Sequence, residues 1–486
     1  MVVTESRLRQ AAFIAALLFF FLFFYQTPFQ TGDSIWSNVI GQWIVTHHHI
    51  PTHDHWAWTA VGQPWTPQEW GFEVLLYLTN HVLGFLGVVL MMTLISVLTW
   101  VVLADLLKRQ GRAYPRLWAL LAAAVSCPWD QIRAETFSYL FFVLTLWVLE
   151  LSKERPRRLF WLIPLELVWV NLHGSYPLGI GVVFWMALVS FLRSFDWGWL
   201  QHTQEKRVGR QRLWTALGMA VVSLVNPQGI HMYTFAFWLS FQTHISKYIM
   251  EWQPATIAEW PTLVLFVELG LFLFLRLQRK EPVRLSELFW ALGTFYMFLK
   301  AVRFGSYAIV TTPWALATNI PFQHHWLERL KQVKGLASVI SLGVAVGCLA
   351  LSVQTGLNVH GTMAQNAAPN VEPKVVQVVL NIHKAHPDWR MWNGYGVGDA
   401  LESAGLPVSI DGRTEVYLAN GFMNTYMKTV DGKTGTLKWF EQKHIRLACV
   451  DKTAPLSELL TVAPGWTRIY NGKHYDLFEK KVGVPA

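Results

Sequence analysis

The chain has 486 residues, of which 53% are hydrophobic and 14% aromatic, whereas only 15% are charged. A soluble domain carries about 25% charged residues, so this composition excludes a single water-soluble globule, a disordered chain and a collagen-like chain. The formal net charge of +9 would indicate nucleic-acid binding only if the basic residues clustered on a soluble face. Cys127, Cys348 and Cys449 lie far apart, which favours neither a disulfide framework nor a thiolate metal site.

Apolar segments separated by short basic patches run through the first 355 residues. If the basic patches are cytoplasmic, 22 Lys and Arg residues lie inside and only Arg133, Lys247, Lys300 and Arg303 lie outside. The positive-inside rule then predicts a cytoplasmic N-terminus and, with eleven spans, an external C-terminus. The excess charge is therefore a topology signal and not a nucleic-acid footprint. The expected spans are 11–28, 82–107, 115–127, 136–152, 157–173, 176–194, 212–226, 261–277, 285–300, 304–320 and 335–354.

This pattern divides the chain into a transmembrane domain, 1–355, and a soluble extracytoplasmic α/β domain, 356–486. Two outer loops, 29–81 and 227–260, belong to the transmembrane domain. We expect the N-terminal apolar stretch to be an uncleaved anchor, because no small-residue cleavage pattern follows it. In the α/β domain, β-like runs are predicted at 375–380, 407–410, 446–450 and 474–478, with turns at Asn393-Gly394, Asp411-Gly412, Asp431-Gly432 and Asn471-Gly472.

Asp33 lies just past the first expected span and directly before a predicted short helix over 34–46. One interpretation is that Asp33 or Ser34 caps this helix, because a carboxylate accepts backbone N–H bonds and suits the helix dipole. The other is that Asp33 is a general base at the membrane surface, where it takes the proton of an attacking hydroxyl. The sequence leaves both interpretations open.

The first outer loop also contains closely spaced histidines at positions 47, 48, 49, 53 and 55. The three consecutive ones diverge by about 100° each on a helix, so only those at 49, 53 and 55, with Asp54, can converge on a zinc ion. Interfacial histidines beside tryptophans are the alternative interpretation. We assign no metal ligands from the sequence.

Charged residues at the outer membrane surface usually face a cavity, because burying them in lipid is costly. Lys300 and Arg303 lie between two expected spans, and with Arg133 they suit recognition of a phosphate or pyrophosphate group. Snorkelling toward lipid headgroups is the alternative. His173 interrupts an apolar segment beside Gly174, so it either hydrogen-bonds a sugar or phosphate or caps a broken helix.

Several short motifs lie along the chain. The first outer loop carries GDxxWxxxxGQWI, IPxxDxW and GQPWxxQEW. Later motifs are RAETFSYLFF (133–142), WVNLHGSYPLG (169–179), NPQGIHMY (226–233), YIMEWQP (248–254), KAVRFGSY (300–307), NGYGVGDAL (393–401) and IDGRTEVY (410–417). Together they resemble bacterial membrane glycosyltransferases of the C-type (GT-C) superfamily, which use polyprenyl-phosphate-sugar donors, and the resemblance covers nearly the whole chain.

It implies an α-helical polytopic protein of a bacterial inner membrane, with a GT-C-like bundle of about eleven transmembrane helices and a C-terminal extracytoplasmic α/β domain. The essential acid of the superfamily's first outer loop maps to Asp33, and we add Glu69 of the same loop to the candidate substrate-binding residues. Some relatives have adjacent Asp-Glu where this chain has Asp33-Ser34. A second acid is offered by Asp130 or Glu135, but without the usual paired spacing. The sequence thus leaves open whether the protein uses a divalent metal, because no clear metal-binding motif is present.

The implied reaction is a single, inverting displacement at an anomeric carbon. Asp33 would activate an acceptor hydroxyl, while Lys300 and Arg303, with Arg133 or His173, would stabilise the polyprenyl-phosphate leaving group. The partners would be a polyprenyl-phosphate-linked sugar, the lipid bilayer and a glycan, lipid or protein acceptor.

Two alternatives belong to other classes of protein. A transporter or flippase of lipid-linked sugars would share the aromatic belt and the cavity charges, but it should show internal symmetry. A non-catalytic assembly factor of an envelope polysaccharide system would keep the fold and dispense with Asp33.

Overall fold

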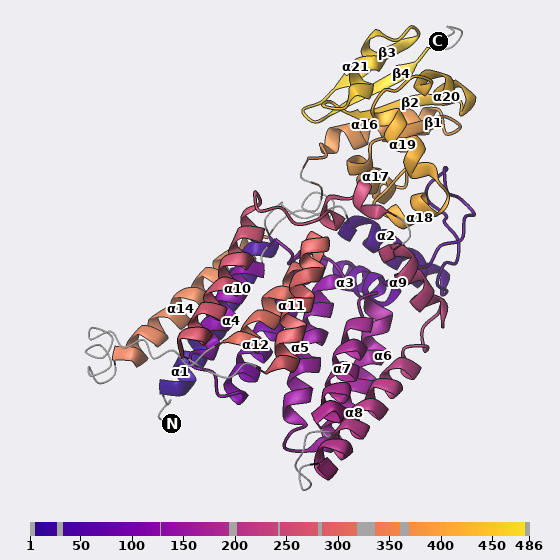
Figure 1. The fold of residues 1–486 in the computed structure, drawn as a ribbon. Coiled ribbons are helices and arrows are strands. Elements are labelled where there is room, and N and C mark those ends of the chain that lie inside the picture. The colour runs from indigo at the N-terminus through magenta and orange to yellow at the C-terminus, as the bar shows by residue number, and fades with distance from the viewer. Residues whose placement is uncertain are drawn as a thin grey trace. The chain divides into compact units, whose positions relative to one another are not determined.

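The computed structural model describes residues 5–26, 33–126, 128–193, 202–241, 244–279, 284–317, 336–359, 368 and 370–481 (Figure 1). The chain divides into two compact units, and each combines segments that are distant in sequence. Unit 1 comprises Met1–Tyr25, Val89–Ala236 and His244–Val359. Unit 2 comprises Gln26–Val88, Phe237–Thr243 and His360–Ala486.

Unit 1 is built mainly from apolar helices that pack side by side (Figure 1). Its helices are α1 (Glu5–Tyr25), α4 (Pro115–Ser126), α5 (Glu135–Leu151), α6 (Leu162–Leu172), α7 (Pro177–Arg193), α8 (His202–Val222), α10 (Trp260–Arg279), α11 (Leu285–Lys300), α12 (Gly305–Leu316) and α14 (Leu336–Leu357). The 3₁₀ turns are η1 (Pro156–Trp161), η2 (Ile245–Lys247), η3 (Met250–Trp252) and η4 (Val302–Phe304). Two helices, α3 (Trp70–Arg109) and α9 (His231–Phe241), cross from one unit into the other.

The central helices of unit 1 are apolar on every side. Every residue of α12 is buried, and so is most of α5, which is the pattern of a core helix. Some of their hydroxyl groups bond within the helix: Thr145 Oγ1 donates to the Phe141 carbonyl (2.8 Å), and Thr312 Oγ1 donates to the Ala308 carbonyl (2.7 Å). Others bond a neighbouring helix, as Thr311 Oγ1 does with Thr294 Oγ1 (2.5 Å).

Three of the described helical segments are long and apolar enough to cross a membrane: Glu5–Tyr25, Trp70–Arg109 and Ser338–Leu357. Shorter apolar helices cover Pro115–Ser126, Pro177–Arg193 and Thr262–Phe274. Each of the eleven expected spans overlaps a helix, so the helical positions are confirmed while the number of crossings stays a prediction. The chain has the character of a multi-pass membrane protein.

Helix α3 carries one non-helical residue, Gly84, with φ 66° and ψ −168°. A residue with a Cβ would be strained at this positive φ, and glycine is not. The part of α3 before Val89 belongs to unit 2 and the rest to unit 1. The break thus lies close to the boundary between the units.

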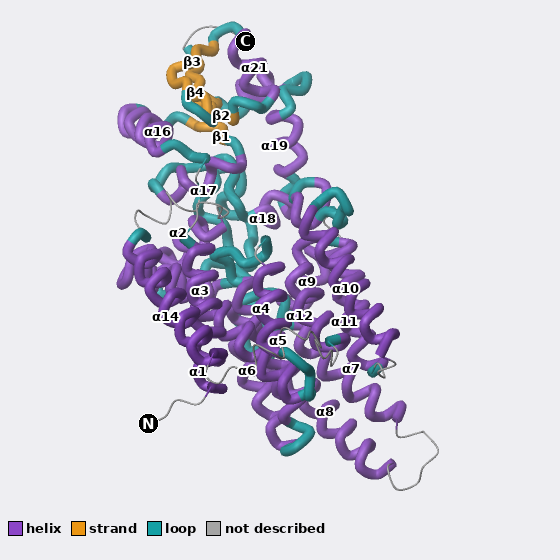
Figure 2. The backbone as a smooth tube through the Cα atoms, turned by 90° about the vertical axis from the view of Figure 1, so that its left-hand side faces the viewer, coloured by secondary structure: helices purple, strands orange, loops and turns teal. Residues whose placement is uncertain are grey.

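Unit 2 contains a four-stranded sheet in the order β1-β2-β4-β3, and Figure 2 shows its strands among helices and loops. The β1–β2 pair is parallel, and the β2–β4 and β3–β4 pairs are antiparallel. The strands are β1 (Arg390–Asn393), β2 (Ile445–Asp451), β3 (Trp466–Asn471) and β4 (Tyr475–Lys480). The helices are α2 (Asp33–His47), α16 (Pro373–Ala385), α17 (Tyr395–Ser403), α18 (Thr414–Ala419), α19 (Phe422–Val430), α20 (Thr436–Gln442) and α21 (Pro455–Val462).

Several local predictions for unit 2 are confirmed. The helix expected over 34–46 is α2, the runs 446–450 and 474–478 lie in β2 and β4, and the Asn471-Gly472 turn joins β3 to β4. The strand predicted at 375–380 is wrong, because these residues belong to the amphipathic helix α16, which begins with Pro373 and buries Val375 and Val379. The run 407–410 forms only an isolated parallel bridge, from Val408 to Ala57.

Candidate functional site

Asp33 is the first residue of α2, and this helix packs against α17. Its Oδ1 accepts a long hydrogen bond from Trp36 Nε1 (3.4 Å). Its negative charge helps to raise the pKa of Tyr395 and of Asp399 in α17, which are raised first by their burial. Asp33, half-buried, therefore lies in the field of a second, buried carboxyl group, Asp399, whose Oδ1 accepts the Gly412 N–H (2.7 Å).

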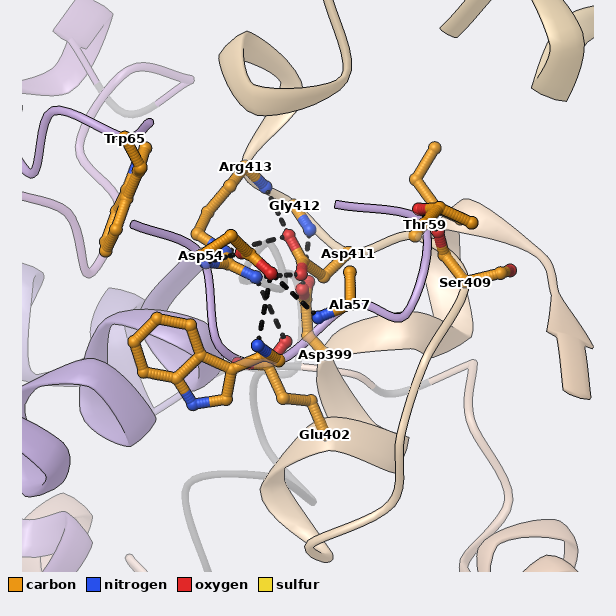
Figure 3. A network of polar contacts seen from close by, with 12 residues as sticks. Asp54, Ala57, Thr59, Trp65, Asp399, Glu402, Ser409, Asp411, Gly412 and Arg413 are labelled. Atoms are coloured by element: carbon orange, nitrogen blue, oxygen red, sulfur yellow. Dashed lines mark hydrogen bonds and ion pairs between the residues drawn. The ribbon is translucent and has the colours of Figure 1, made fainter. Parts of the chain in front are cut away.

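The first outer loop is joined to the C-terminal domain, residues 368–481, by a network around Arg413 (Figure 3). The guanidinium pairs with Asp54 of the loop (Nη1 to Oδ2, 2.5 Å) and with Asp411, and Glu402 lies 4.0 Å away. All four side chains are almost completely buried. We call Arg413, Asp54, Asp411 and Glu402 the Arg413 cluster.

Aromatic side chains and hydrogen bonds to backbone carbonyls also connect the first outer loop to the C-terminal domain. The Arg413 guanidinium lies 4.7 Å from the Trp56 ring centroid and 5.1 Å from that of Trp65. Trp58 Nε1 donates to the Met391 carbonyl (2.8 Å), and Thr59 Oγ1 donates to the Ser409 carbonyl (2.5 Å). Trp56, Trp58 and Trp65 of the first outer loop therefore serve packing in unit 2.

The Arg413 cluster contains more carboxyl groups than cations. Burial raises the pKa of Asp54, although Arg413 lowers it in part, and burial together with repulsion from Asp411 raises the pKa of Glu402 well above its usual value. For Asp411 burial also acts to raise the pKa, but the attraction of Arg413 outweighs it and lowers the pKa. Glu402 thus favours its neutral form beside an ionised Asp411.

The histidines of the first outer loop gather around Trp43, not around Asp54. Trp43 stacks with His47 (ring centroids 4.4 Å apart) and with His55 (4.9 Å), and His49 meets it edge-on (4.7 Å). Asp54, which the zinc interpretation required, is held by Arg413. Among the residues that the structure describes, no three His, Cys, Asp or Glu side chains are grouped as metal ligands.

In unit 1 the structure brings Arg133 and Arg303 together, and we call them the arginine pair. Glu251 bridges them: its Oε2 lies 2.5 Å from Arg133 Nη1, and its Oε1 lies 3.8 Å from Arg303 Nη1. Arg303 Nη2 also lies 3.4 Å from Glu135 Oε2, and its guanidinium stacks over Trp252 at 4.5 Å. Burial raises the pKa of Glu251, but the two arginines outweigh this effect and lower that pKa to about 2.

The other predicted residues make contacts of their own. Lys300 is exposed at the end of α11, with its ammonium 5.6 Å from the Tyr296 ring. His173 is buried at the end of α6, where its Nδ1 lies 2.8 Å from both Ser138 Oγ and Ser175 Oγ. Glu69 directly precedes α3, and its backbone carbonyl accepts the Glu73 N–H (3.0 Å).

Sequence reasoning missed Glu251 and Asp399 as individual residues. Both lie inside motifs that the sequence singled out, YIMEWQP and NGYGVGDAL, and this was the available signal. Four of the motifs meet in the arginine-pair region, since RAETFSY supplies Arg133 and Glu135, YIMEWQP supplies Glu251, and KAVRFGSY supplies Arg303. His173 of WVNLHGSYPLG joins them through Ser175, whose Oγ accepts the Tyr307 hydroxyl (2.8 Å).

No family model matches the sequence, and no curated protein matches it. Solved structures do match. The apo oligosaccharyltransferase of Archaeoglobus fulgidus aligns with a TM-score of 0.56 and 12% identity, over 92% of this chain and 69% of that one. AglB of the same organism, in complex with an inhibitory peptide and a dolichol-phosphate, aligns with a TM-score of 0.56 and 11% identity, over 98% and 74%.

The arabinofuranosyltransferase AftD from Mycobacteria aligns with a TM-score of 0.53 and 11% identity. This match covers 99% of the present chain and 40% of AftD, so the chain spans less than half of AftD's length. The oligosaccharyltransferase and AftD are both GT-C glycosyltransferases. The chain has the GT-C fold, as the sequence motifs predicted.

Proposed function

We propose that this protein is a membrane glycosyltransferase that moves a sugar from a polyprenyl-phosphate carrier to an extracytoplasmic glycan, lipid or protein acceptor. The observation that carries the proposal is the fold, because the match to GT-C enzymes extends over nearly the whole chain. The solved AglB complex contains a dolichol-phosphate, and another oligosaccharyltransferase structure contains an acceptor peptide. A lipid-linked donor is therefore the natural substrate class to test first.

In the proposed reaction, Asp33 takes the proton of the acceptor hydroxyl as its oxygen attacks the anomeric carbon. The bond from that carbon to the carrier phosphate breaks, and the product sugar has inverted configuration. The arginine pair stabilises the charge that develops on the departing phosphate. Lys300, His173 and Glu69 are further candidate contacts to the substrate.

The environment of Asp33 supports its proposed role. It is half-buried, and the neighbouring Asp399 has a pKa raised well above its usual value, first by burial and then by repulsion from Asp411. The negative charge of Asp33 adds to that rise, so the two carboxyl groups interact. A carboxyl group whose pKa is perturbed by burial and by neighbouring charges is typical of functional sites.

The test is turnover of polyprenyl-phosphate-linked sugars by the purified full chain, measured as release of polyprenyl phosphate. Asp33→Asn keeps the shape and a carbonyl oxygen, so it should fold like the parent. If Asp33 is the base, it should lose about 10²–10⁴ in rate. Asp388→Asn, which alters an exposed acid of the same unit, is the matched control and should retain parental turnover.

Near-parental turnover in Asp33→Asn would assign this residue to helix capping instead of catalysis. An inactive parent with every polyprenyl-phosphate sugar tested would contradict the proposed donor class. Binding of prenyl phosphates, recorded in the same preparations, separates a lost base from a lost substrate site.

A further inference from the structure

The arginine pair is not a bare cationic site, because two carboxylates already neutralise it. Arg133 and Arg303 face Glu251 and Glu135, so the four side chains sum to zero charge when all are ionised. A phosphate that approaches this site must therefore replace an internal anion or bind without a net attraction. Glu251 and Glu135 differ in how readily a phosphate could replace them.

Glu251 occupies the position that a bridging anion would take. One of its carboxylate oxygens faces Arg133 and the other faces Arg303, which is how two oxygens of a phosphate would span two guanidinium groups. Glu135 forms an ion pair with Arg303, and with only 9% of its side chain exposed it is fixed as the first residue of α5. Glu251 has 32% of its side chain exposed, the largest fraction of the four.

The backbone around Glu251 is anchored, so a side-chain rotation is enough to release the arginine pair. Val302 N–H donates to the Gln253 carbonyl (3.1 Å), and Ala255 N–H donates to the Leu299 carbonyl (3.3 Å). The neighbouring Trp252 keeps Arg303 in place by stacking on its guanidinium. Glu251 belongs to a 3₁₀ turn of three residues, whereas Glu135 is held by a 17-residue helix.

We propose that Glu251 is an internal stand-in for the substrate phosphate, and that a phosphate-bearing lipid binds the arginine pair by displacing the Glu251 carboxylate. This inference rests on the proposed function, since it names how the donor phosphate is recognised. The two arginines outweigh the effect of burial and lower the pKa of Glu251 to about 2, so the exchange that we propose is of one anion for another. The exchange also gives selectivity, because an uncharged lipid cannot substitute for the carboxylate.

Displacement predicts that removal of a site residue strengthens binding, whereas removal of most binding-site residues weakens it. Glu251→Gln removes the competing charge and should tighten the binding of farnesyl phosphate to the full-length detergent-purified protein by about tenfold. A residue that merely orients the arginines would do the opposite, since its loss would weaken binding. Glu251→Asp keeps the charge on a shorter side chain and should give an affinity between those of the parent and Glu251→Gln.

Two matched variants separate displacement from other effects. Glu135→Gln raises the charge of the site equally but removes a fixed neighbour of Arg303, so it should not tighten binding. Arg133→Gln should weaken farnesyl phosphate binding by tenfold or more. Farnesol, which has the same chain without the anion, should bind all variants alike, and inorganic phosphate tests whether the lipid chain is needed. Melting temperatures confirm that each variant is folded.

Unchanged or weaker binding by Glu251→Gln, with a binding-competent parent, would overturn the displacement while leaving the proposed function intact. Equal tightening by Glu135→Gln would also overturn it, in favour of net charge. If inorganic phosphate binds in a Glu251-dependent way and farnesyl phosphate does not bind better, the displacement stands and the lipid donor class fails.

Discussion

Arg413 is a single side chain on which two distant parts of the sequence depend. Its guanidinium is fully buried, between the rings of Trp56 and Trp65 and among the carboxyl groups of its cluster. Breaking a buried ion pair by removing one partner is costly, because the remaining charge is left without compensation. Arg413 therefore has a structural role. The charged residues around it in the IDGRTEVY motif would suggest a solvent-exposed position instead.

We expect Arg413→Ala to lower the free energy of unfolding by about 3–5 kcal/mol. Chemical unfolding of the purified chain, followed by tryptophan fluorescence, measures it. Arg390→Ala is the control, because Arg390 is exposed, lies over the Trp58 ring and donates one long hydrogen bond to the Lys443 carbonyl (3.3 Å), so its loss should cost less than about 1 kcal/mol. Similar costs for both variants would refute the role of Arg413.

The raised pKa of Glu402 makes the stability of the folded protein depend on pH. Because burial and Asp411 raise the folded-state pKa of Glu402 above 4.5, the folded protein binds more protons there than the unfolded chain. The stabilisation is complete below that value and is lost as the pH rises through the folded-state pKa. Asp54 and Asp399 contribute with the same sign, whereas Asp411, whose pKa is lowered, loses stability as the pH falls.

The expected result is that Glu402→Gln flattens the decline of melting temperature with rising pH. The amide is neutral at every pH and nearly isosteric, so it should hold the stability that the parent loses. Glu458→Gln, at an exposed acid of α21, should leave the parental slope unchanged. A parental slope in Glu402→Gln would show that this group does not bind the extra proton.

At the scale of elements, α2 and α3 approach so closely that only a glycine fits between them. A Cβ at Gly41 would overlap the backbone carbonyl of Glu73, which belongs to α3. The backbone cannot yield as a flexible side chain would. Close packing against α3 therefore explains why the GQWI motif begins with a glycine, Gly41.

Gly41→Ala should destabilise the protein by about 1–3 kcal/mol, because it forces the two helices apart. Gly270→Ala in α10 is the control: a Cβ there has no neighbour within 4 Å, so alanine should be neutral or stabilise by up to about 1 kcal/mol. Thermal unfolding of both variants measures the difference, and equal melting temperatures would contradict the close approach.

Element positions could be predicted from sequence where the pattern is long. Apolar runs bounded by basic patches gave each helix of the expected spans, since burial in lipid demands continuous apolarity. The run 375–380 was misread because five apolar residues around Gln377 fit a strand as well as a helix face. The short strands β1 and β3 carry too few alternating residues for a clear signal.

The candidate site was predictable only in part, for a different physical reason. Arg133 and Arg303 could be predicted as site residues because they lie outside the basic patches. Nothing in the sequence distinguishes Glu251 from the other acidic residues, since its role depends on the two arginines that it contacts in the fold. The bond between Trp58 and Met391 joins residues 333 positions apart, and no local pattern encodes such a pairing. Asp33 and Lys300 remain predictions about function.

At the scale of the whole molecule, the proposed orientation places both the first outer loop and the C-terminal domain outside the cytoplasm. Single cysteines at Gln63 and Thr434, both exposed, should react with an impermeant maleimide in intact cells whose outer layer is permeable. The background would carry no native cysteines. Protection of either position until the membrane is opened would overturn the orientation that the basic patches predict.

The pairing of the first outer loop with the C-terminal domain also has a consequence for biosynthesis. Residues 54–65 leave the ribosome early, while Arg413 and Met391 are translated more than 300 positions later. At about 5–20 residues per second, the loop waits roughly 15–70 s for its partners. During this interval Trp56, Trp58 and Asp54 lack their partners in the C-terminal domain, so a chain arrested before residue 390 would present an aggregation-prone loop.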